Sequence, residues 1–435
     1  MVVMVAPAMH VAKRCGSVWR VRYRWFDTCW RHTYSAVLTG LICMNVTRTA
    51  VPASLDLLRR LIAFPTVSRD SNLALIEFAR AHLAAAGAVT RLTYDDDRRK
   101  ANLFATLGPP TDGGIVLSGH TDVVPVDGQA WRSDPFTLTQ RDGRLYGRGS
   151  ADMKSFVAVA LALAPEFAQR GLRRPLHFAL SYDEEVGCIG VGRLIEDLDA
   201  AGIHPEACIV GEPTMMRPVI AHKGKLSYRC TVRGLSCHSA YAPQGVNAVE
   251  AAAEAIAFLK SMARRYRDHG PYDRGFDIAH TTVHTGVIRG GTALNIVPNE
   301  CVFDFEFRNL PGDDPQAMFA EFTKFIATSI EPEMRAVDPA SGFSIAPLSA
   351  MPALSNAPEA EIVGLAQELS GNHDFGKVSF GTEAAHFQRR GMPAVVCGPG
   401  SIAQAHKADE YIEIEQVLKC EEFMRRLMAR ICKAG

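Results

Sequence analysis

Histidine and acidic side chains follow four short apolar runs of this sequence, at the points where buried strands are expected to end. They are His120 and Asp122 in IVLSGHTD, Asp183, Glu184 and Glu185 in LHFALSYDEEVG, Glu212 in CIVGEPT, and His406 in AVVCGPGSIAQAHKADEY. Asp152, in GRGSADMKSF, stands immediately before an expected helix. Because ligands of an open α/β sheet bind beyond the carboxyl ends of its strands, we expect these side chains to meet at one edge of a sheet.

Each of these residues has an ordinary structural explanation when it is taken alone. Asp152 before a helix is typical of an N-cap, adjacent glutamates such as Glu184 and Glu185 are usually solvated, and a single histidine such as His406 is usually structural. Their occurrence together needs another explanation, because several carboxylates at one sheet edge would repel one another unless cations neutralised them. The pattern therefore favours a metal site.

The residue types at this edge indicate which metal would bind and how many ions. Two imidazoles with several carboxylates and no thiolate suit Zn, Co or Mn. One catalytic metal needs about three protein ligands. His120, Asp152, Glu212, His406 and one residue of the Glu184–Glu185 pair offer more, which fits two ions that share Asp152.

The chemistry expected of such a centre is hydrolysis, because a bound divalent cation lowers the pKa of water to about 7. Successive side chains of an extended segment point to opposite sides. One glutamate of the Glu184–Glu185 pair can therefore ligate metal while the other acts as general base. Asp122 is placed to accept the second ring N–H of His120 and fix its tautomer.

Short apolar runs alternate with helical patterns in the parts of the chain that carry these residues, which predicts an α/β fold with a mixed sheet flanked by helices. The alternation stops at residues 225–337, which contain several strand-like runs and two helical patterns. This pattern predicts an inserted α+β sandwich. We therefore expect a catalytic domain made of residues 44–224 and 338–435, interrupted by an inserted domain over 225–337.

Composition excludes several classes of protein. Of 435 residues, 47 are Lys or Arg and 47 are Asp or Glu, so no overall field attracts nucleic acid or anionic membranes. No run is long and apolar enough to span a bilayer, and the eleven cysteines lack CxxC spacing, which favours reduced thiols in a cytoplasm. Residues 1–43 are basic and poor in acids, and we expect a disordered or mis-started extension before Met44.

Five segments in this order resemble the M20 family of di-zinc aminoacylases and deacetylases, over about residues 50–435. The segments are GHTDVVPVDGQAW, YGRGSADMKSF, SYDEEVGCIGV, VGEPT and HKADEY. The resemblance implies that the inserted domain serves as lid and dimerisation domain of a homodimer. It assigns roles to the residues at the sheet edge: His120 and His406 each bind one zinc, Asp152 bridges both, Glu185 and Glu212 complete the two sites, and Glu184 is the general base.

Within the family the sequence is most similar to members that remove the acetyl group from N2-acetyl-L-ornithine, as YGRGSADMKSF, GTEAAHF and HKADEYI indicate. The resemblance then implies a small N-acyl amino acid as substrate. It implies that His238 stabilises the oxyanion in the partner's site, and that Arg308, Asn295, Thr382 and Glu383 bind substrate. Arg308 suits an α-carboxylate, and Glu383 would meet the δ-ammonium of ornithine. Ala385 and His386 depart from the family pattern, and we expect His386 not to ligate metal.

Three alternatives stay open. A succinyl-diaminopimelate desuccinylase or another N-acyl-amino-acid amidohydrolase would share the metal-binding segments. A metal-binding scaffold without turnover would keep the fold, although an intact Glu184 argues against it. Lys223 and Lys225, in HKGKLS, could touch substrate, but a solvated pair of surface lysines is the simpler interpretation.

Overall fold

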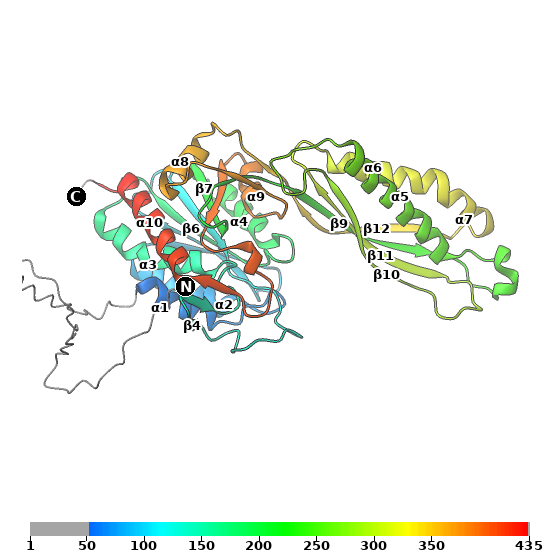
Figure 1. Ribbon diagram of the computed structural model, residues 1–435, viewed down its shortest axis with the longest axis horizontal. Coiled ribbons are helices and arrows are strands. Elements are labelled where there is room, and N and C mark those ends of the chain that lie inside the picture. Colours follow the sequence, from blue (N-terminus) through cyan, green and yellow to red (C-terminus); the bar gives the residue numbers. More distant parts are fainter. Residues whose placement is uncertain (1–51, 434–435) are drawn as a thin grey trace, which may run out of the picture. The chain divides into compact units, whose positions relative to one another are not determined.

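The computed structural model describes residues 52–433, which contain a large mixed sheet and a smaller antiparallel one (Figure 1). In this range the large sheet has nine strands in the order β1-β2-β6-β3-β7-β15-β8-β13, with β14 beside β8. They are β1 (Val89–Tyr94), β2 (Ala101–Leu107), β3 (Ile115–His120), β6 (Leu176–Ser181), β7 (Ala207–Pro213), β8 (Val219–His222), β13 (Leu354–Ser355), β14 (Gly376–Val378) and β15 (Ala394–Gly398). Strands β6, β3, β7 and β15 are parallel, so their carboxyl ends share one edge.

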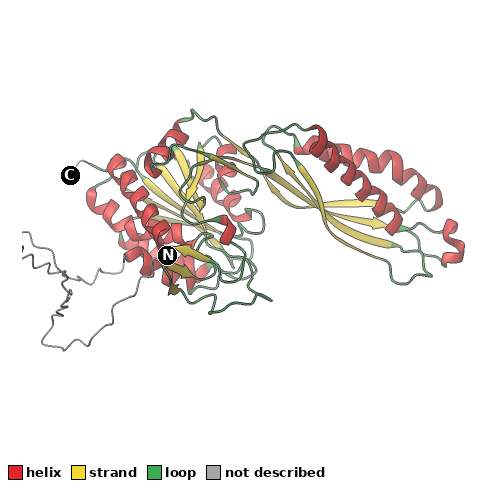
Figure 2. Ribbon diagram, in the orientation of Figure 1, coloured by secondary structure: helices red, strands yellow, loops and turns green. Residues whose placement is uncertain are grey.

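Helices cover both faces of this sheet (Figure 2). They are α1 (Ala53–Ile62), α2 (Leu73–Ala85), α3 (Lys154–Arg170), α4 (Ile189–Ala200), α8 (Glu361–Ser370), α9 (Ala384–Arg389) and α10 (Ile414–Ile431). Adjacent residues of a strand serve opposite faces: Leu117 belongs to the core under α3 and α10, whereas Val116 belongs to the core under α4 and α9. Burial on both faces explains why the central strands are continuously apolar.

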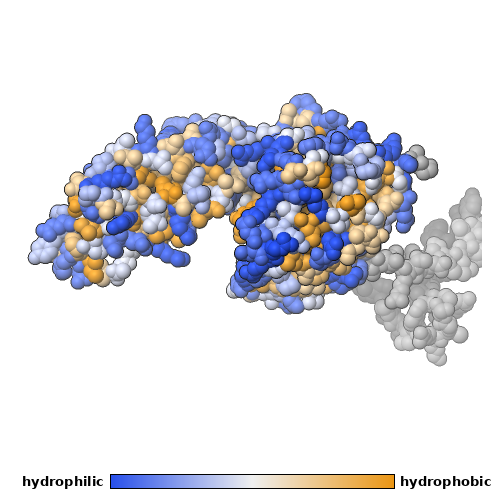
Figure 3. Space-filling view, turned by 180° about the vertical axis from the view of Figure 1, so that it is seen from behind, coloured by the Kyte–Doolittle hydropathy of each residue, from blue (hydrophilic) through white to orange (hydrophobic). Residues whose placement is uncertain are grey.

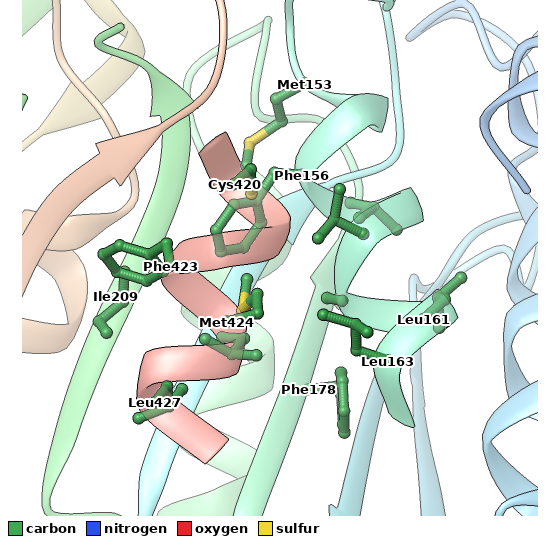
Figure 4. Close-up of a cluster of buried hydrophobic side chains, with 14 of the residues drawn as sticks. Met153, Phe156, Leu161, Leu163, Phe178, Ile209, Cys420, Phe423, Met424 and Leu427 are labelled. Carbon is green, nitrogen blue, oxygen red and sulfur yellow. The ribbon is translucent and has the colours of Figure 1, made fainter. Parts of the chain in front are cut away.

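The packing of α3 and α10 on the sheet anchors one of these cores (Figure 4). Phe156 of α3 and Phe423 of α10 are each 1% exposed, and Met424 and Leu427 are fully buried. Burial of such a side chain contributes about 1.5–3 kcal/mol. The helix α3 leads directly out of the turn that carries Asp152, so this core fixes the turn against the sheet.

A three-stranded sheet, β16-β5-β4, joins two loops that are distant in sequence. Its strands are β4 (Thr139–Arg141), β5 (Arg144–Tyr146) and β16 (Tyr411–Glu413). Tyr411 of β16 pairs with Tyr146 of β5. This register sets the loop before β16, which carries His406, beside the turn after β5, which carries Asp152.

The smaller sheet has four antiparallel strands among the residues that the structure describes, in the order β10-β11-β9-β12. They are β9 (Gly224–Arg233), β10 (Thr282–Gly290), β11 (Glu300–Asn309) and β12 (Gly342–Met351). The helices beside it are α5 (Ala248–His269), α6 (Pro315–Phe325), the π-helical turn η2 (Ile326–Ile330) and α7 (Glu331–Val337). Buried and part-exposed residues alternate along β11, because one face packs under these helices and the other stays open.

The mixed α/β fold predicted from the sequence is confirmed, and an α+β block with its own core lies where an insertion was expected. The strand β12 was not predicted, and it lies beyond residue 337, where the sequence analysis ended the block. Pro347 and the adjacent bulge hide its alternation, and an edge strand tolerates them because it lacks a second pairing partner. The division into a catalytic and a dimerisation domain stays a prediction.

Two expectations concern the rest of the chain. The proposed extension over residues 1–43 lies outside the described residues. Between residues 52 and 433, none of the helices combines the length and the apolar character that a bilayer span needs. Two short 3-10 helices, η1 (Ser239–Gln244) and η3 (Ile402–Gln404), complete the described elements.

Candidate metal centre

The carboxyl edge of the large sheet brings together the five residues that the sequence analysis assigned to metal. His120 is the last residue of β3, and Glu212 lies near the end of the neighbouring parallel strand β7. Glu185 follows β6, and Asp152 and His406 come from the two loops joined by the three-stranded sheet. Each position thus follows from strand order and not from proximity along the chain.

Asp152 stands between the two histidines. Its Oδ1 lies 2.9 Å from Nε2 of His120, and its Oδ2 lies 3.2 Å from Nε2 of His406. Glu212 Oε1 lies 3.6 Å from the first imidazole, and Glu185 Oε2 lies 3.0 Å from the second. Two groups of three potential ligands result, His120–Asp152–Glu212 and Asp152–Glu185–His406, with all ligand atoms of a group within 4.8 Å of one another.

The crowded charges shift the pKa values of these side chains. Burial and the nearby Asp152 raise the pKa of Glu185 to about 7, and burial raises the pKa of Glu212 well above its usual range. Hydrogen bonds with Asp152 and Glu185 raise the pKa of His406 to about 10. These shifts favour protonated carboxylates and a charged imidazole, and a divalent cation bound by the same side chains would displace those protons.

The donor set fits a divalent transition metal. Glu212 Oε1 is buried and has no hydrogen-bond partner among the described residues, although an unsatisfied buried carboxylate oxygen is costly. Two imidazoles and three carboxylates, without a thiolate, are ligands typical of open catalytic sites for Zn, Co or Mn. A cation between His120 and Glu212 would give this oxygen a partner.

Asp122 differs in part from its predicted role. Because a carbonyl can only accept, we assign the Nδ1–H of His120 as donor to the main-chain oxygen of Asp122, at 2.9 Å; the Asp122 carboxylate is farther away, at 3.5 Å. That carboxylate accepts from Ser68 Oγ at 2.7 Å and from the main-chain N–H groups of Glu184 and Glu185 at 3.1 and 3.4 Å. Asp122 thus orients the His120 imidazole, a metal-ligand candidate, and also holds the loop of the two glutamates.

Glu184 lines a cavity that also contains the metal-ligand candidates. The cavity, of about 320 Å³, is lined by Asp152, Glu184, Glu185, Gly187, Glu212, Lys225, Arg308, Met351, Phe380, Gly381, Ile402, Ala405 and His406. The Cys188 thiol donates to Glu184 Oε1 at 3.4 Å, and burial raises the pKa of Glu184 well above its usual range. These features suit a residue that exchanges protons.

Arg308 and Lys225 form the basic side of the same cavity. They are cross-strand neighbours in β11 and β9, and Glu306 lies between them, 2.9 Å from Arg308 Nε and 4.0 Å from Lys225 Nζ. The interpretation of Lys223 and Lys225 as a solvated pair was wrong. Lys223 is 1% exposed and donates to the carbonyl of His280, and period-two alternation along β9 turns Lys225 toward the cavity.

Glu383 and Thr382 do not line this cavity. The Glu383 carboxylate is fully buried and accepts from Ser118 and Ser181, so the pairing with a substrate ammonium expected from the sequence is wrong. Thr382 is also buried, and its hydroxyl accepts from the Ala384 N–H at the start of α9. Both residues anchor the segment that presents Phe380 and Gly381.

His238 and Asn295 lie in the inserted block and not around the metal-ligand candidates of this chain. They lie on two segments that pair with each other, because the N–H of Ser239 donates to the Asn295 carbonyl at 3.0 Å. Within its own segment, His238 Nδ1 accepts from the N–H of Ala240 at 3.1 Å. Both side chains are exposed. His386 belongs to neither ligand group found in residues 52–433, and burial lowers its pKa to about 4.

Arg148 and Glu410 were not among the residues predicted from the sequence, although each is 1% exposed, they lie 2.7 Å apart, and Glu410 accepts from the Asp152 N–H. The signal was present in the segments YGRGSAD and HKADEY, in which a charged residue stands close to each proposed ligand. Without knowledge of burial, however, neither residue differs from an ordinary surface charge.

Comparisons with known proteins agree with this geometry. Residues 116–430 match the family model described as peptidase family M20/M25/M40. The chain is 38% identical over 388 residues to the acetylornithine deacetylase of Myxococcus xanthus, covering 88% of this chain and 98% of that protein. It is 33% identical over 390 residues to the acetylornithine deacetylase of Pasteurella multocida, covering 88% and 99%.

Solved structures share the fold at lower sequence identity. An M20 family metallo-carboxypeptidase from Sulfolobus solfataricus superimposes with a TM-score of 0.69 at 16% identity, covering 87% of this chain and 99% of that chain. The aminopeptidase PepT from Bacillus cereus gives a TM-score of 0.65 at 21% identity, covering 86% and 97%. These likenesses confirm the fold class.

Proposed function

The chain belongs to peptidase family M20/M25/M40 and is a metal-dependent hydrolase, and we propose that it removes the acetyl group from N2-acetyl-L-ornithine to give ornithine and acetate. One observation carries the proposal: two His/carboxylate groups share Asp152 beside a cavity that also holds Glu184 and Arg308. Relatives named acetylornithine deacetylase, at 38% and 33% identity over nearly the whole of their length, support the choice of substrate.

We assign two zinc ions to the centre, with cobalt or manganese as substitutes. One ion would be held by His120, Asp152 and Glu212, and the other by Asp152, Glu185 and His406. When bound, the metal supplies Lewis-acid activation of water and of the amide carbonyl. The charges are compatible, since three ligating carboxylates offset most of the charge of two divalent cations.

Glu184 is the proposed general base. The Cys188 thiol engages its Oε1, which leaves Oε2 for proton exchange. That oxygen would take a proton from the attacking water and deliver it to the amide nitrogen as the C–N bond breaks. The main-chain hydrogen bond to Asp122 keeps Glu184 in place during both transfers.

Arg308 and Lys225 are the proposed contacts for the substrate α-carboxylate. Their charges exceed that of Glu306 by one, so the basic side of the cavity can accept an anionic group. Met351, Phe380 and Ile402 provide apolar wall for the aliphatic part of the substrate. Apart from the metal and base candidates, the described residues that line the cavity include no carboxylate for the ornithine ammonium.

A second copy of the chain is the proposed partner and would complete the site with His238 and Asn295. Strand β10 is an edge of the four-stranded sheet and exposes Val287 and Ile288, at 43% and 52%. Leu294 is 101% exposed, and hydrophobic residues reach the surface around this sheet (Figure 3). An unpaired, apolar strand edge is suited to pairing with the same edge of another protomer.

The basic side of the cavity also favours a second candidate, hydrolysis of N-succinyl-diaminopimelate. That substrate carries an additional carboxylate, and Lys225 would offer it a cationic partner. An inactive scaffold is not retained, because the family assignment supports a metal-dependent hydrolase and both groups of potential ligands lie beside the proposed base Glu184.

Initial rates on metal-loaded protein decide between the two substrates. We expect kcat/KM for N2-acetyl-L-ornithine to exceed that for N-succinyl-diaminopimelate by at least about tenfold, which corresponds to about 1.4 kcal/mol of transition-state discrimination. A preference for the succinylated substrate would overturn the proposed function and leave the hydrolytic centre intact.

A further inference from the structure

The position of His406 is not explained by the packing of its own side chain. The side chain is 51% exposed, and the backbone is left-handed, with φ of 64°, a conformation that is uncommon for residues other than glycine. The ligand candidates of the other group are held in place differently, because His120 and Glu212 lie on the paired strands β3 and β7. His406 therefore needs support from outside its loop.

Glu410 links the His406 loop to the turn that carries the bridging ligand. Its buried carboxylate accepts from the main-chain N–H groups of Gly149, Ala151 and Asp152, at 3.0, 2.8 and 3.1 Å. It also accepts from Arg148 Nη1 at 2.7 Å. One side chain thus satisfies the donors of the turn and holds the backbone of Asp152.

Arg148 extends this network to a third segment. Its Nη2 donates to Gln129 Oε1 at 2.6 Å, and its guanidinium lies 5.1 Å from the centre of the Trp131 ring. The Trp131 indole N–H donates to the same Gln129 oxygen at 3.0 Å. Because two donors face that oxygen, the orientation of the Gln129 amide is determined.

Gln129 closes the network on His406. With its oxygen engaged by Arg148 and Trp131, the amide nitrogen points to the main-chain carbonyl of His406 and donates at 3.0 Å. The same segment makes a second connection, since the N–H of Arg132 donates to Asp409 Oδ1 at 2.9 Å. The hydrogen bonds therefore run without a break from His406 through Gln129, Arg148 and Glu410 to Asp152.

We propose that Gln129, Arg148 and Glu410 are positioning residues that set the separation of Asp152 and His406 and so determine the affinity of the second metal ion. The inference rests on the two-metal centre of the proposed function. It predicts an asymmetric effect when Gln129 is changed, because Gln129 holds His406, a ligand candidate of one site only, whereas Arg148 and Glu410 hold Asp152, which both sites share.

The test uses full-length protein freed of metal with a chelator and titrated with Zn²⁺ against a competing chelator. Gln129→Glu keeps an acceptor for Arg148 but sets a carboxylate oxygen against the His406 carbonyl. Loss of an outer hydrogen-bond partner typically costs 10–100-fold in metal affinity. We expect a loss of about that size in one of the two binding events, with the other changed by less than about threefold.

Gln367→Glu is the matched control, because the Gln367 amide also donates to a histidine main-chain carbonyl, that of His373, at 2.5 Å. It should leave both affinities unchanged. Gln129→Leu provides a second variant without added charge, and the partial exposure of Gln129 favours normal folding of both variants.

Equal weakening of both binding events, or no weakening in either Gln129 variant, would overturn the inference. If the wild-type protein binds two ions and the Gln129 variants lose one, but the preferred substrate is not acetylornithine, only the proposed function fails. A wild-type protein that binds one ion would refute the two-metal centre and the inference together.

Discussion

Replacement of Glu184 by Gln separates proton transfer from metal binding. The glutamine side chain has the same size, and the main-chain N–H at this position, which donates to Asp122, would be unchanged. The amide oxygen could still accept from the Cys188 thiol, as Glu184 Oε1 does at 3.4 Å. The substitution therefore removes little except the ability to take and return a proton.

The expected loss follows from that single change. General acid–base catalysis contributes about 10²- to 10⁴-fold in rate, so we expect kcat to fall by that factor. The corresponding rise of the activation free energy is about 2.7–5.4 kcal/mol. KM and the metal content should stay within about threefold of the wild-type values, because neither Arg308 nor a proposed ligand is altered.

Steady-state kinetics measures kcat and KM of Glu184→Gln, and elemental analysis of the same preparation measures its metal content. The matched control is Glu185→Gln, one residue away, which should lose metal because Glu185 Oε2 faces His406 Nε2 at 3.0 Å. Near-normal kcat in Glu184→Gln would refute the assignment of the base. Loss of metal in Glu184→Gln, with retention in Glu185→Gln, would show that the two roles are exchanged.

Three further predictions test other parts of the site. Arg308→Met should raise KM by about 10- to 100-fold, because a charge-assisted hydrogen bond contributes about 1.5–3 kcal/mol. The control Arg229→Met, which removes an exposed ion pair on the same sheet, should leave KM unchanged. Equal KM values for the two variants would exclude Arg308 as the carboxylate contact. Metal binding near pH 7.5 should release protons, because the pKa is about 10 for His406 and about 7 for Glu185 without metal. Metal affinity should therefore fall as the pH falls. Calorimetric binding heats that do not depend on the buffer would contradict the predicted proton release. Leu294→Asp should give monomers in analytical ultracentrifugation and reduce kcat by about 10²- to 10³-fold through loss of an oxyanion donor; a wild-type protein that is monomeric and active would rule out the shared site.

The metal-ligand candidates could be predicted from the sequence because each follows a feature that the sequence shows directly. His120 and Glu212 end continuous apolar runs, and parallel strands end at one edge of a sheet. Asp152 precedes a strongly apolar helix. Once these runs are recognised as strands of one sheet, no knowledge of side-chain contacts is needed to bring the residues together.

The errors concern residues whose roles depend on contacts across loops. Glu383 follows a short Gly–Thr segment, but whether it faces a cavity or the serines of β3 and β6 depends on how that segment docks. The direction of Lys225 depends on the register of β9 with β11. The network of Gln129, Arg148 and Glu410 joins three segments through single hydrogen bonds, which no periodic pattern reports.

Anomalous diffraction from crystals grown with zinc tests the central claim most directly. The account predicts two peaks on either side of the Asp152 carboxylate, about 3.5–4 Å apart, one beside His120 and the other beside His406. A single peak, or peaks that lie away from Asp152, would contradict it.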